Sequence, residues 1–476
     1  MILKQSATYM AASLVAALTG VASVAIFTRM LAPAEYGVYA IAMAKAATAA
    51  ALLFTWLRLS ILRFQSEGGD VDLRRTALFG YAASALLVPI AIVLMPSASV
   101  TSVAVMAATI VYTQMYALFD IGQETLRARQ FVPAYVQTAI LRSCLALLLG
   151  AIAVALFGGG IAIILSAALA YLVTALFQMR SAWAAPLALF DKAMLRRMFI
   201  YGAPLTVAGL ATTVHMVFDR LALGYFQDSA AAGQFAAIAD FTRQCVALPV
   251  AGVFSAIVPA IMQTFARGDA TATRRQLSES GELLIAGVLP TAIGLIIVTP
   301  HLAVLVFGAE FRAAAELVMP SLAIAWTAHL VAQQYVHLSF QMAEKPHLLI
   351  MHSVALVFFS FCFIGAGAKY FGILGTAYGL VASEFFGFLL AVYLTRFGHP
   401  LPAFLSGIAR VIAATAVMAV ITFGVRALIP WQPGIGPLLV LSAIGAMSYG
   451  AAAIALNVAG LRASVARFLE RRALRA

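Results

Sequence analysis

The sequence predicts an all-α integral membrane protein with about fourteen transmembrane helices. Of its 476 residues, 63% are hydrophobic and 10% are charged, whereas a soluble domain carries about 25% charged residues. The mean hydropathy of +0.99 excludes a soluble or disordered chain. The apolar residues form long runs that match helices of roughly 20 residues, and the short alternating strands of a membrane β-barrel are not seen.

The ends of the spans follow from charges, from Pro and Gly breaks and from the limits of the apolar runs. An uncharged stretch of 24 residues, Gln5 to Thr28, follows Lys4. This stretch is longer than the apolar core of a signal peptide and many spans follow it, so we expect an uncleaved first helix. The expected spans are residues 7–29, 36–58, 77–95, 100–122, 133–156, 160–180, 200–224, 233–262, 281–306, 315–340, 347–368, 374–395, 404–427 and 437–459.

Basic residues predict the orientation, because cytoplasmic loops of membrane proteins are enriched in Lys and Arg. With fourteen spans, both termini lie on one side. Twenty-one basic residues fall in the termini and loops of that side, and four, Arg29, Arg312, Lys369 and Arg426, fall on or near the other. We therefore expect both termini in the cytoplasm, with residues 461–475 forming a basic amphipathic helix on the anionic inner leaflet. The net charge of +12 then needs no nucleic acid partner.

Part of the sequence is repeated. Residues 27–30 and 37–40 read FTRM and GVYA, and residues 218–221 and 233–236 read FDRL and GQFA. A second echo is Phe-Gly at 157–158 and again at 371–372. Six helices separate the copies, so both halves enter the membrane in the same sense. This predicts a parallel repeat about a pseudo-two-fold axis along the membrane normal, as in some transporters.

Six short motifs occur in order along the chain. They are PAEYGVY at 33–39, LRARQF at 126–131, YGAP at 201–204, DRLALG at 219–224, FGAEF at 307–311 and YFGILG at 370–375. Together they resemble the polysaccharide and O-antigen flippases, the oligosaccharidyl-lipid branch of the multidrug/oligosaccharidyl-lipid/polysaccharide exporter superfamily. The resemblance covers nearly the whole chain. Phe235 departs from it, since the family more often has tyrosine there.

The resemblance implies two six-helix lobes around a central cavity, with two extra C-terminal helices outside. The expected parts are residues 1–180 (first lobe), 181–199 (an amphipathic cytoplasmic linker), 200–396 (second lobe) and 397–476 (helices 13 and 14 with a basic tail).

The resemblance also implies a function. The substrate would be a lipid-linked oligosaccharide, usually on undecaprenyl pyrophosphate. The protein would flip it by alternating access from the inner to the outer leaflet of the bacterial cytoplasmic membrane, for lipopolysaccharide or exopolysaccharide synthesis. Expected partners are membrane lipids, a polysaccharide polymerase and glycosyltransferases, and no enzymatic activity is expected.

Charged residues inside the spans are the candidates for a functional site. A charge at the bilayer centre costs about 2.5–3.5 kcal/mol on insertion scales unless it faces a cavity or a partner. At ~1.5 Å per residue, Lys45, Arg142 and Arg243 lie near mid-depth, and Arg29 and Arg220 lie nearer the outer face. We expect these cations to bind the pyrophosphate and acidic sugars of the substrate, because Arg offers a fork of donors and Lys a point charge.

The outer charges could instead have a purely structural role. Asp219 and Arg220 precede one outer hairpin and Asp240 and Arg243 follow it, so these residues could simply pair with each other. Arg29 could pair in the same way with a nearby carboxylate, Glu35 in the first outer loop.

The deeper cations lie farther from any carboxylate. Lys45 and Arg142 have no acid in their own hairpins, so in a structural role each would either snorkel to the membrane interface or pair with a remote residue. Glu384 could carry a coupled proton, although we favour pairing with a cation.

Polar and aromatic groups without a fixed charge have a simpler interpretation. We expect His215, His329 and His337 to be hydrogen-bonded core residues rather than proton relays. For Trp326 we favour packing over stacking on a sugar.

No metal or cofactor is expected. Cys144, Cys245 and Cys362 lie far apart in apolar stretches without metal-ligand spacing. No G-x-x-x-x-G-K-[ST] loop for ATP is present. Rocking of the two lobes needs no ATP if the membrane potential drives it, because a negative headgroup moving outward gains about 2.3 kcal/mol per charge per 100 mV.

Three competing functions fit the sequence less well. A multidrug or cation antiporter of the same superfamily is the main alternative. A cationic drug needs acidic residues in the cavity, because opposite charge must replace its lost hydration. The only span acid of the first lobe, Asp120, lies near the cytoplasmic end, and this favours an anionic substrate. A glycosyltransferase is disfavoured because the D-x-D pattern at 70–72 lies in a short loop. A sugar transporter is disfavoured because the loop at 64–70 lacks the G-x-x-x-D-R-x-G-R pattern.

Overall fold

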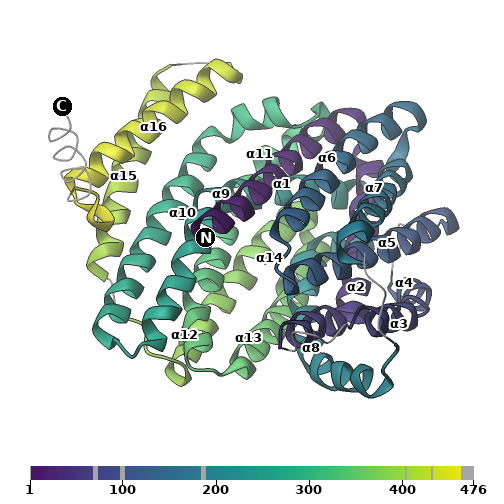
Figure 1. Cartoon of the computed structure of the whole chain (residues 1–476). Coiled ribbons are helices and arrows are strands. Elements are labelled where there is room, and N and C mark those ends of the chain that lie inside the picture. Colours follow the sequence, from purple (N-terminus) through teal and green to yellow (C-terminus); the bar gives the residue numbers. More distant parts are fainter. Residues whose placement is uncertain are drawn as a thin grey trace, which may run out of the picture. The chain divides into compact units, whose positions relative to one another are not determined.

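The computed structural model describes residues 2–67, 73–96, 102–183, 189–402, 405–429 and 432–462, all in helices and connecting turns (Figure 1). Within this part of the chain, eleven helices are long and apolar enough to cross a membrane, and Leu14–Met30 and Ile257–Ala266 are shorter apolar helices. The predicted all-α, multi-pass membrane fold is therefore confirmed. The D-x-D segment and most of the basic tail lie outside the described residues.

The chain divides into two compact units. The first comprises Met1–Ala237 and Ser353–Leu380, and the second comprises Ile238–His352 and Val381–Ala476. The predicted lobe boundaries remain predictions.

The first unit is built mainly from the N-terminal helices. They are α1 (Ile2–Met30), α2 (Pro33–Glu67), α3 (Arg74–Ala85), α4 (Val88–Leu94), α5 (Val103–Ala128), α6 (Val132–Phe157), α7 (Gly159–Ala182), α8 (Lys192–Phe226), the start of α9 (Ser229–Ala266), the end of α13 (Pro346–Phe359), the π-helix η2 (Ser360–Ile364) and the first half of α14 (Gly365–Leu394).

The second unit contains the remaining helices. They are the rest of α9, α10 (Ala270–Val306), α11 (Ala309–Val331), the π-helix η1 (Ala332–Val336), α12 (His337–Met342), the start of α13, the second half of α14, η3 (Thr395–Phe397), α15 (Leu405–Leu428), α16 (Ile435–Ala455) and η4 (Val458–Gly460).

One predicted span and the predicted linker differ in detail from the structure. The third span is broken into α3 and α4 by a turn at Leu86 and Leu87, just before Pro89, which occupies the first turn of α4 and cannot donate a backbone hydrogen bond. The predicted linker 181–199 is partly helical, because α8 already begins at Lys192. The carboxylate of Asp191 caps this helix by accepting from the Met194 N–H at 3.0 Å.

Spans 11 and 12 form one continuous helical stretch that reverses at Gly372, where φ is +58°. Gly367 and Gly375 pack backbone to backbone on the two arms. Gly379 packs in the same way against the carbonyl of Phe363. Small residues therefore allow the arms to approach closely, as at other membrane helix interfaces.

Helix α2 lies at the centre of the first unit. Gly202 of α8 packs on the Trp56 carbonyl, and the Ser60 hydroxyl donates to the Met198 carbonyl at 2.6 Å. Phe54, Trp56 and Met198 belong to one buried apolar cluster. This packing fixes α2, which carries both Lys45 and Arg58.

In the second unit, polar contacts attach α15, α16 and η4 to α10. The Glu282 carboxylate accepts from the Ala459 N–H at 2.9 Å and pairs with Arg410 at 3.3 Å. The Tyr449 hydroxyl donates to the Ala286 carbonyl at 2.8 Å, and Arg426 donates to the Ile297 carbonyl at 2.6 Å. Contacts at several levels of α10 therefore hold the C-terminal helices in place.

Candidate functional site

Helix α5 carries a stripe of aromatic and acidic side chains. Tyr112, Tyr116, Asp120 and Glu124 are each four residues apart, so they share one face of the helix. The two tyrosine rings are nearly parallel, with their centroids 6.3 Å apart. The stripe is about 18 Å long at 1.5 Å per residue. Its aromatic half lies in the middle of the span and its acidic half near the end.

The aromatic half of this stripe surrounds Tyr171 of α7. The ring centroid of Tyr171 lies 5.5 Å from that of Tyr112 and 5.4 Å from that of Tyr116, in edge-to-face geometry. The guanidinium carbon of Arg142, on α6, lies 5.6 Å from the Tyr171 centroid. A cation over an aromatic face is attracted by the ring quadrupole. Three tyrosines and one arginine from three helices thus form a single cluster.

Arg142 holds its positive charge deep in the membrane span. It lies ten residues from the start of α6 at Val132, about 15 Å along the helix. Its Nη2 donates to the Ser143 hydroxyl at 2.8 Å. Within the described residues, Arg142 forms no ion pair with a carboxylate. In this part of the chain, no carboxylate therefore neutralises its positive charge.

The acidic half of the stripe is neutralised by arginines. Arg58 Nε lies 2.8 Å from Asp120 Oδ2, and its Nη2 lies 3.5 Å from Glu124 Oε1. Arg127 Nη1 lies 3.7 Å from the other oxygen of Glu124. The nearby Gln178 is 1% exposed, and neither of its amide atoms has a hydrogen-bond partner within the described residues. This end of the stripe is therefore a polar centre whose charges are largely balanced.

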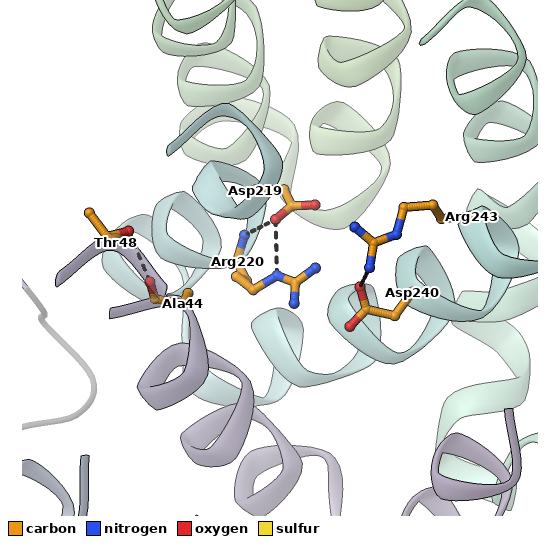
Figure 2. A network of polar contacts seen from close by, with 6 residues as sticks. All are labelled: Ala44, Thr48, Asp219, Arg220, Asp240 and Arg243. Atoms are coloured by element: carbon orange, nitrogen blue, oxygen red, sulfur yellow. Dashed lines mark hydrogen bonds and ion pairs between the residues drawn. The ribbon is translucent and has the colours of Figure 1, made fainter. Parts of the chain in front are cut away.

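Lys45 has a backbone partner that the sequence did not predict. Its side chain is buried, and Nζ donates to the Met95 carbonyl at 3.0 Å, directly after the C-terminus of α4. One turn away on α2, the Thr48 hydroxyl donates to the Ala44 carbonyl at 2.9 Å (Figure 2). A cation at a helix C-terminus is favourable, so this geometry favours a structural role for Lys45. Substrate binding by Lys45 remains a prediction.

The expected outer partners Arg29 and Glu35 each contact another group. Arg29 Nη1 donates to the Ala25 carbonyl of its own helix at 2.7 Å. The Glu35 carboxylate accepts from the Gly160 N–H at 2.7 Å, at the N-terminus of α7, where a negative charge is stabilising. Glu35 therefore attaches the start of α2 to α7.

Asp219 and Arg220 contact each other, as expected for a structural pair. Arg220 Nε lies 3.3 Å from Asp219 Oδ1, and this oxygen also accepts from the Arg220 backbone N–H at 2.6 Å (Figure 2). Both residues are buried. Much of the Arg220 charge is therefore compensated within the protein.

In the second unit, five predicted residues form a connected row. Arg243 Nη2 lies 3.3 Å from Asp240 Oδ1 (Figure 2), and the Arg243 guanidinium lies 5.6 Å from the Trp326 centroid. Trp326 meets His329 edge to face at 5.3 Å. His329 Nδ1 lies 2.9 Å from Glu384 Oε1, with both side chains buried. The sequence predicts a cationic partner for Glu384, and His329 is one of its partners in the structure.

The remaining span histidines are also hydrogen-bonded. His215 Nδ1 lies 2.7 Å from the Ser360 hydroxyl. His337 Nε2 lies 3.2 Å from His352 Nδ1. The predicted core role of these histidines agrees with this geometry.

The tyrosine cluster is not predicted by a search of the spans for charges. The sequence signal for the α5 part of this cluster is the four-residue spacing of the stripe. Glu124 was missed because the predicted span ended at residue 122, whereas α5 continues to Ala128.

Known structures share this helical architecture. "Lipid II flippase MurJ, inward closed conformation" aligns with a TM-score of 0.77 and 11% identity, over 94% of this chain and 98% of that chain. "Inward-facing conformation of a multidrug resistance MATE family transporter of the MOP superfamily" aligns with a TM-score of 0.62 and 14% identity, over 81% of this chain and 94% of that chain. At such identities the likeness shows the fold alone.

A match between the sequence and a family model shows the family of this chain. No curated protein matches the chain. A family model described as "Polysaccharide biosynthesis protein" matches residues 2–265, more than half of the 476 residues. This confirms the family predicted from the six motifs. The chain belongs to the polysaccharide biosynthesis protein family.

Proposed function

We propose that this protein is a flippase that moves a lipid-linked oligosaccharide of the undecaprenyl-pyrophosphate type from the inner to the outer leaflet of the bacterial cytoplasmic membrane. The family and the fold support transport rather than catalysis. The observation that carries the proposal is Arg142, a cation at mid-depth that lies against Tyr171 and has no carboxylate partner among the described residues.

The cluster offers two kinds of contact to such a substrate. The guanidinium of Arg142 provides a planar fork of donors that matches phosphate oxygens. The partly buried rings of Tyr112 and Tyr116 have apolar faces with polar hydroxyl tips, which suit sugar rings bearing hydroxyl groups. Tyr171 is buried and packs against both rings. We place the pyrophosphate at Arg142 and the first sugars against the tyrosines.

The remaining membrane cations have secondary roles in this proposal. Arg220 and Arg243 each have an acidic neighbour, so they would contact the substrate only while sharing their charge. Arg29 would assist near the outer face. Asp219, Asp240 and Glu384 then serve as charge partners rather than ligands.

The membrane potential supplies the drive in this mechanism. Moving two negative charges outward across 100 mV gains about 4–5 kcal/mol, so alternating access would need no ATP. Both termini would lie in the cytoplasm, where glycosyltransferases make the substrate, and a polymerase would receive it outside.

Flipping in proteoliposomes tests the proposal. Arg142→Gln should lower the initial rate of flipping of a lipid-linked oligosaccharide at least tenfold, and Arg142→Lys should restore part of it. Tyr171→Ala should reduce the rate, and Tyr171→Phe should retain most of it because the ring remains. Arg275→Gln is the control, since that side chain is 73% exposed. A wild-type rate for Arg142→Gln would contradict the proposed site.

A multidrug or cation exporter is the second candidate. The carboxylates of Asp120 and Glu124 on α5 favour it, as does the likeness to multidrug transporters. Both acids already pair with Arg58, however, so a cationic substrate would have to displace an arginine, and this makes the exporter less favourable. Resistance to cationic dyes in cells expressing the protein, lost in Asp120→Asn, would support the exporter.

A further inference from the structure

An open pocket of about 520 Å³ lies in the first unit where α5, α6 and α7 end or begin. Its walls come from the α5–α6 turn, the first turns of α6 and the last turn of α7. The lining residues are Arg129, Phe131, Pro133, Ala134, Gln137, Arg180 and Ser181. In the predicted orientation, these ends lie at the cytoplasmic surface of the membrane.

The charged groups that line this pocket are both positive. Arg129 and Arg180 are the charged residues of its lining, and Gln137 and Ser181 are the neutral polar ones. Neither arginine forms an ion pair with a carboxylate in the part of the chain that the structure describes. No carboxylate of the described residues therefore compensates the two positive charges, and the pocket suits an anion.

Each arginine contacts an aromatic ring, and Arg129 also contacts a backbone carbonyl. The guanidinium of Arg129 lies 5.3 Å from the Phe131 centroid, and that of Arg180 lies 5.9 Å from the Phe177 centroid. Arg129 Nη1 also donates to the Ala182 carbonyl at 3.4 Å. A guanidinium has five N–H donors, so most of those on Arg129 remain for a ligand. Preorganisation of the Arg129 side chain lowers the entropy that is lost on binding.

Exposed apolar side chains occur on the pocket wall and on the last turns of α7. Phe131 is 45% exposed and Phe177 is 42% exposed. Leu176 and Met179, on the same last turns of α7, are each 54% exposed. In a membrane protein, such exposed apolar groups contact acyl chains. The site therefore combines cations at headgroup depth with an apolar surface at acyl depth.

We infer that this pocket binds the phosphodiester headgroup of an acidic phospholipid of the inner leaflet. The phosphate would lie between the guanidinium groups of Arg129 and Arg180, with Gln137 and Ser181 contacting a hydroxylated headgroup such as glycerol. The acyl chains would lie against Phe131 and Phe177. This lipid is a resident ligand and not the transported substrate, so the inference is independent of the proposed flippase activity.

Lipid binding to the purified full-length protein tests the inference. Native mass spectrometry in detergent would compare dioctanoyl phosphatidylglycerol with dioctanoyl phosphatidylcholine. We expect the wild type to bind phosphatidylglycerol at least tenfold more tightly, and the double variant Arg129→Gln/Arg180→Gln to lose this preference. The matched control is Arg196→Gln/Arg197→Gln, which also removes two cations, one of them 5.5 Å from the Phe64 ring.

Three results would overturn the inference. Equal binding of both lipids would show that the headgroup charge is not recognised. An equal loss in the control variant would show only a general surface attraction. Glycerol 3-phosphate binding as tightly as phosphatidylglycerol would show that the ligand is a soluble phosphate. If the double variant does not fold, Ala134→Trp decides, because it fills the pocket, keeps both charges and should weaken phosphatidylglycerol binding at least tenfold.

Discussion

Gly37 of α2 packs directly against Gly233 of α9. An added Cβ on Gly233 would lie 2.6 Å from the Gly37 backbone nitrogen and 2.9 Å from its Cα. A Cβ added to Gly37 would overlap the carbonyl oxygen of Ser229, which lies one turn before Gly233 on α9. These two glycines are the matching residues of the internal repeat, so the repeated G-x-[YF]-A motifs contact each other at their first residues.

This contact predicts that neither glycine tolerates a methyl group. Gly37→Ala and Gly233→Ala should each lower the free energy of unfolding by about 1–3 kcal/mol, the usual cost of forcing atoms into a packed interface. Thermal unfolding of the purified protein in detergent measures the effect. Gly294→Ala is the control, since nothing lies within 4 Å of its added Cβ. A wild-type unfolding temperature for Gly37→Ala would show that the helices separate easily.

The second echo of the repeat also has a conformational reason. Gly158 has φ +65° and ψ 176°, and Gly372 has φ +58° and ψ −139°. Each turns the chain between two helices, after the fifth and the eleventh predicted spans. Positive φ combined with extended ψ is accessible almost only to glycine.

Substitutions at these turns should be costly even where space is free. Nothing lies within 4 Å of a Cβ added to Gly158, so Gly158→Ala isolates backbone strain, expected to cost about 1–3 kcal/mol. Gly372→Ala should cost a similar amount. Gly450→Ala in α16 also meets no neighbour and should be neutral or stabilising by up to about 1 kcal/mol, because alanine favours helices. Equal unfolding temperatures for all three variants would contradict this explanation.

The fold could be predicted because long apolar runs and few charges permit little else than membrane helices. The helix ends were less predictable. Helix α8 begins at Lys192 and α10 begins at Ala270, whereas the expected spans begin at 200 and 281. Charged residues suggest loops, but a helix can continue past the bilayer into water with polar side chains.

Prediction of the candidate site was limited by tertiary contacts. The α5 stripe could have been found from its four-residue spacing. The contact of Lys45 with Met95 and that of Arg58 with Asp120 join residues 50 and 62 positions apart, and no local pattern specifies which helices pack together. Pairs close in sequence, such as Asp219 with Arg220, could be anticipated.

The buried pair of His329 and Glu384 predicts a measurable coupling energy. Glu384→Ala leaves the His329 ring without this partner, and loss of a buried hydrogen bond costs about 1–3 kcal/mol. The double variant His329→Ala/Glu384→Ala should be less destabilised than the sum of the single variants, with a coupling of about 0.5–3 kcal/mol. Glu279→Ala is a suitable control, since this residue is 68% exposed. Strict additivity in chemical unfolding would show that the contact contributes little.

Lys45 and Arg142 should respond differently to loss of charge. Because Lys45 is buried and donates to the Met95 carbonyl, Lys45→Met should cost about 1–3 kcal/mol of stability by leaving that carbonyl without its donor. The rate of flipping per folded molecule of Lys45→Met should then stay within about twofold of wild type. In Arg142→Gln the rate should fall without a comparable loss of stability, because Arg142 lies against an aromatic face with its charge available to a ligand. Measuring unfolding and flipping on the same preparations separates the two effects. If Lys45→Met instead keeps its stability and loses flipping tenfold, Lys45 contacts the substrate directly, and its hydrogen bond to α4 must break during transport.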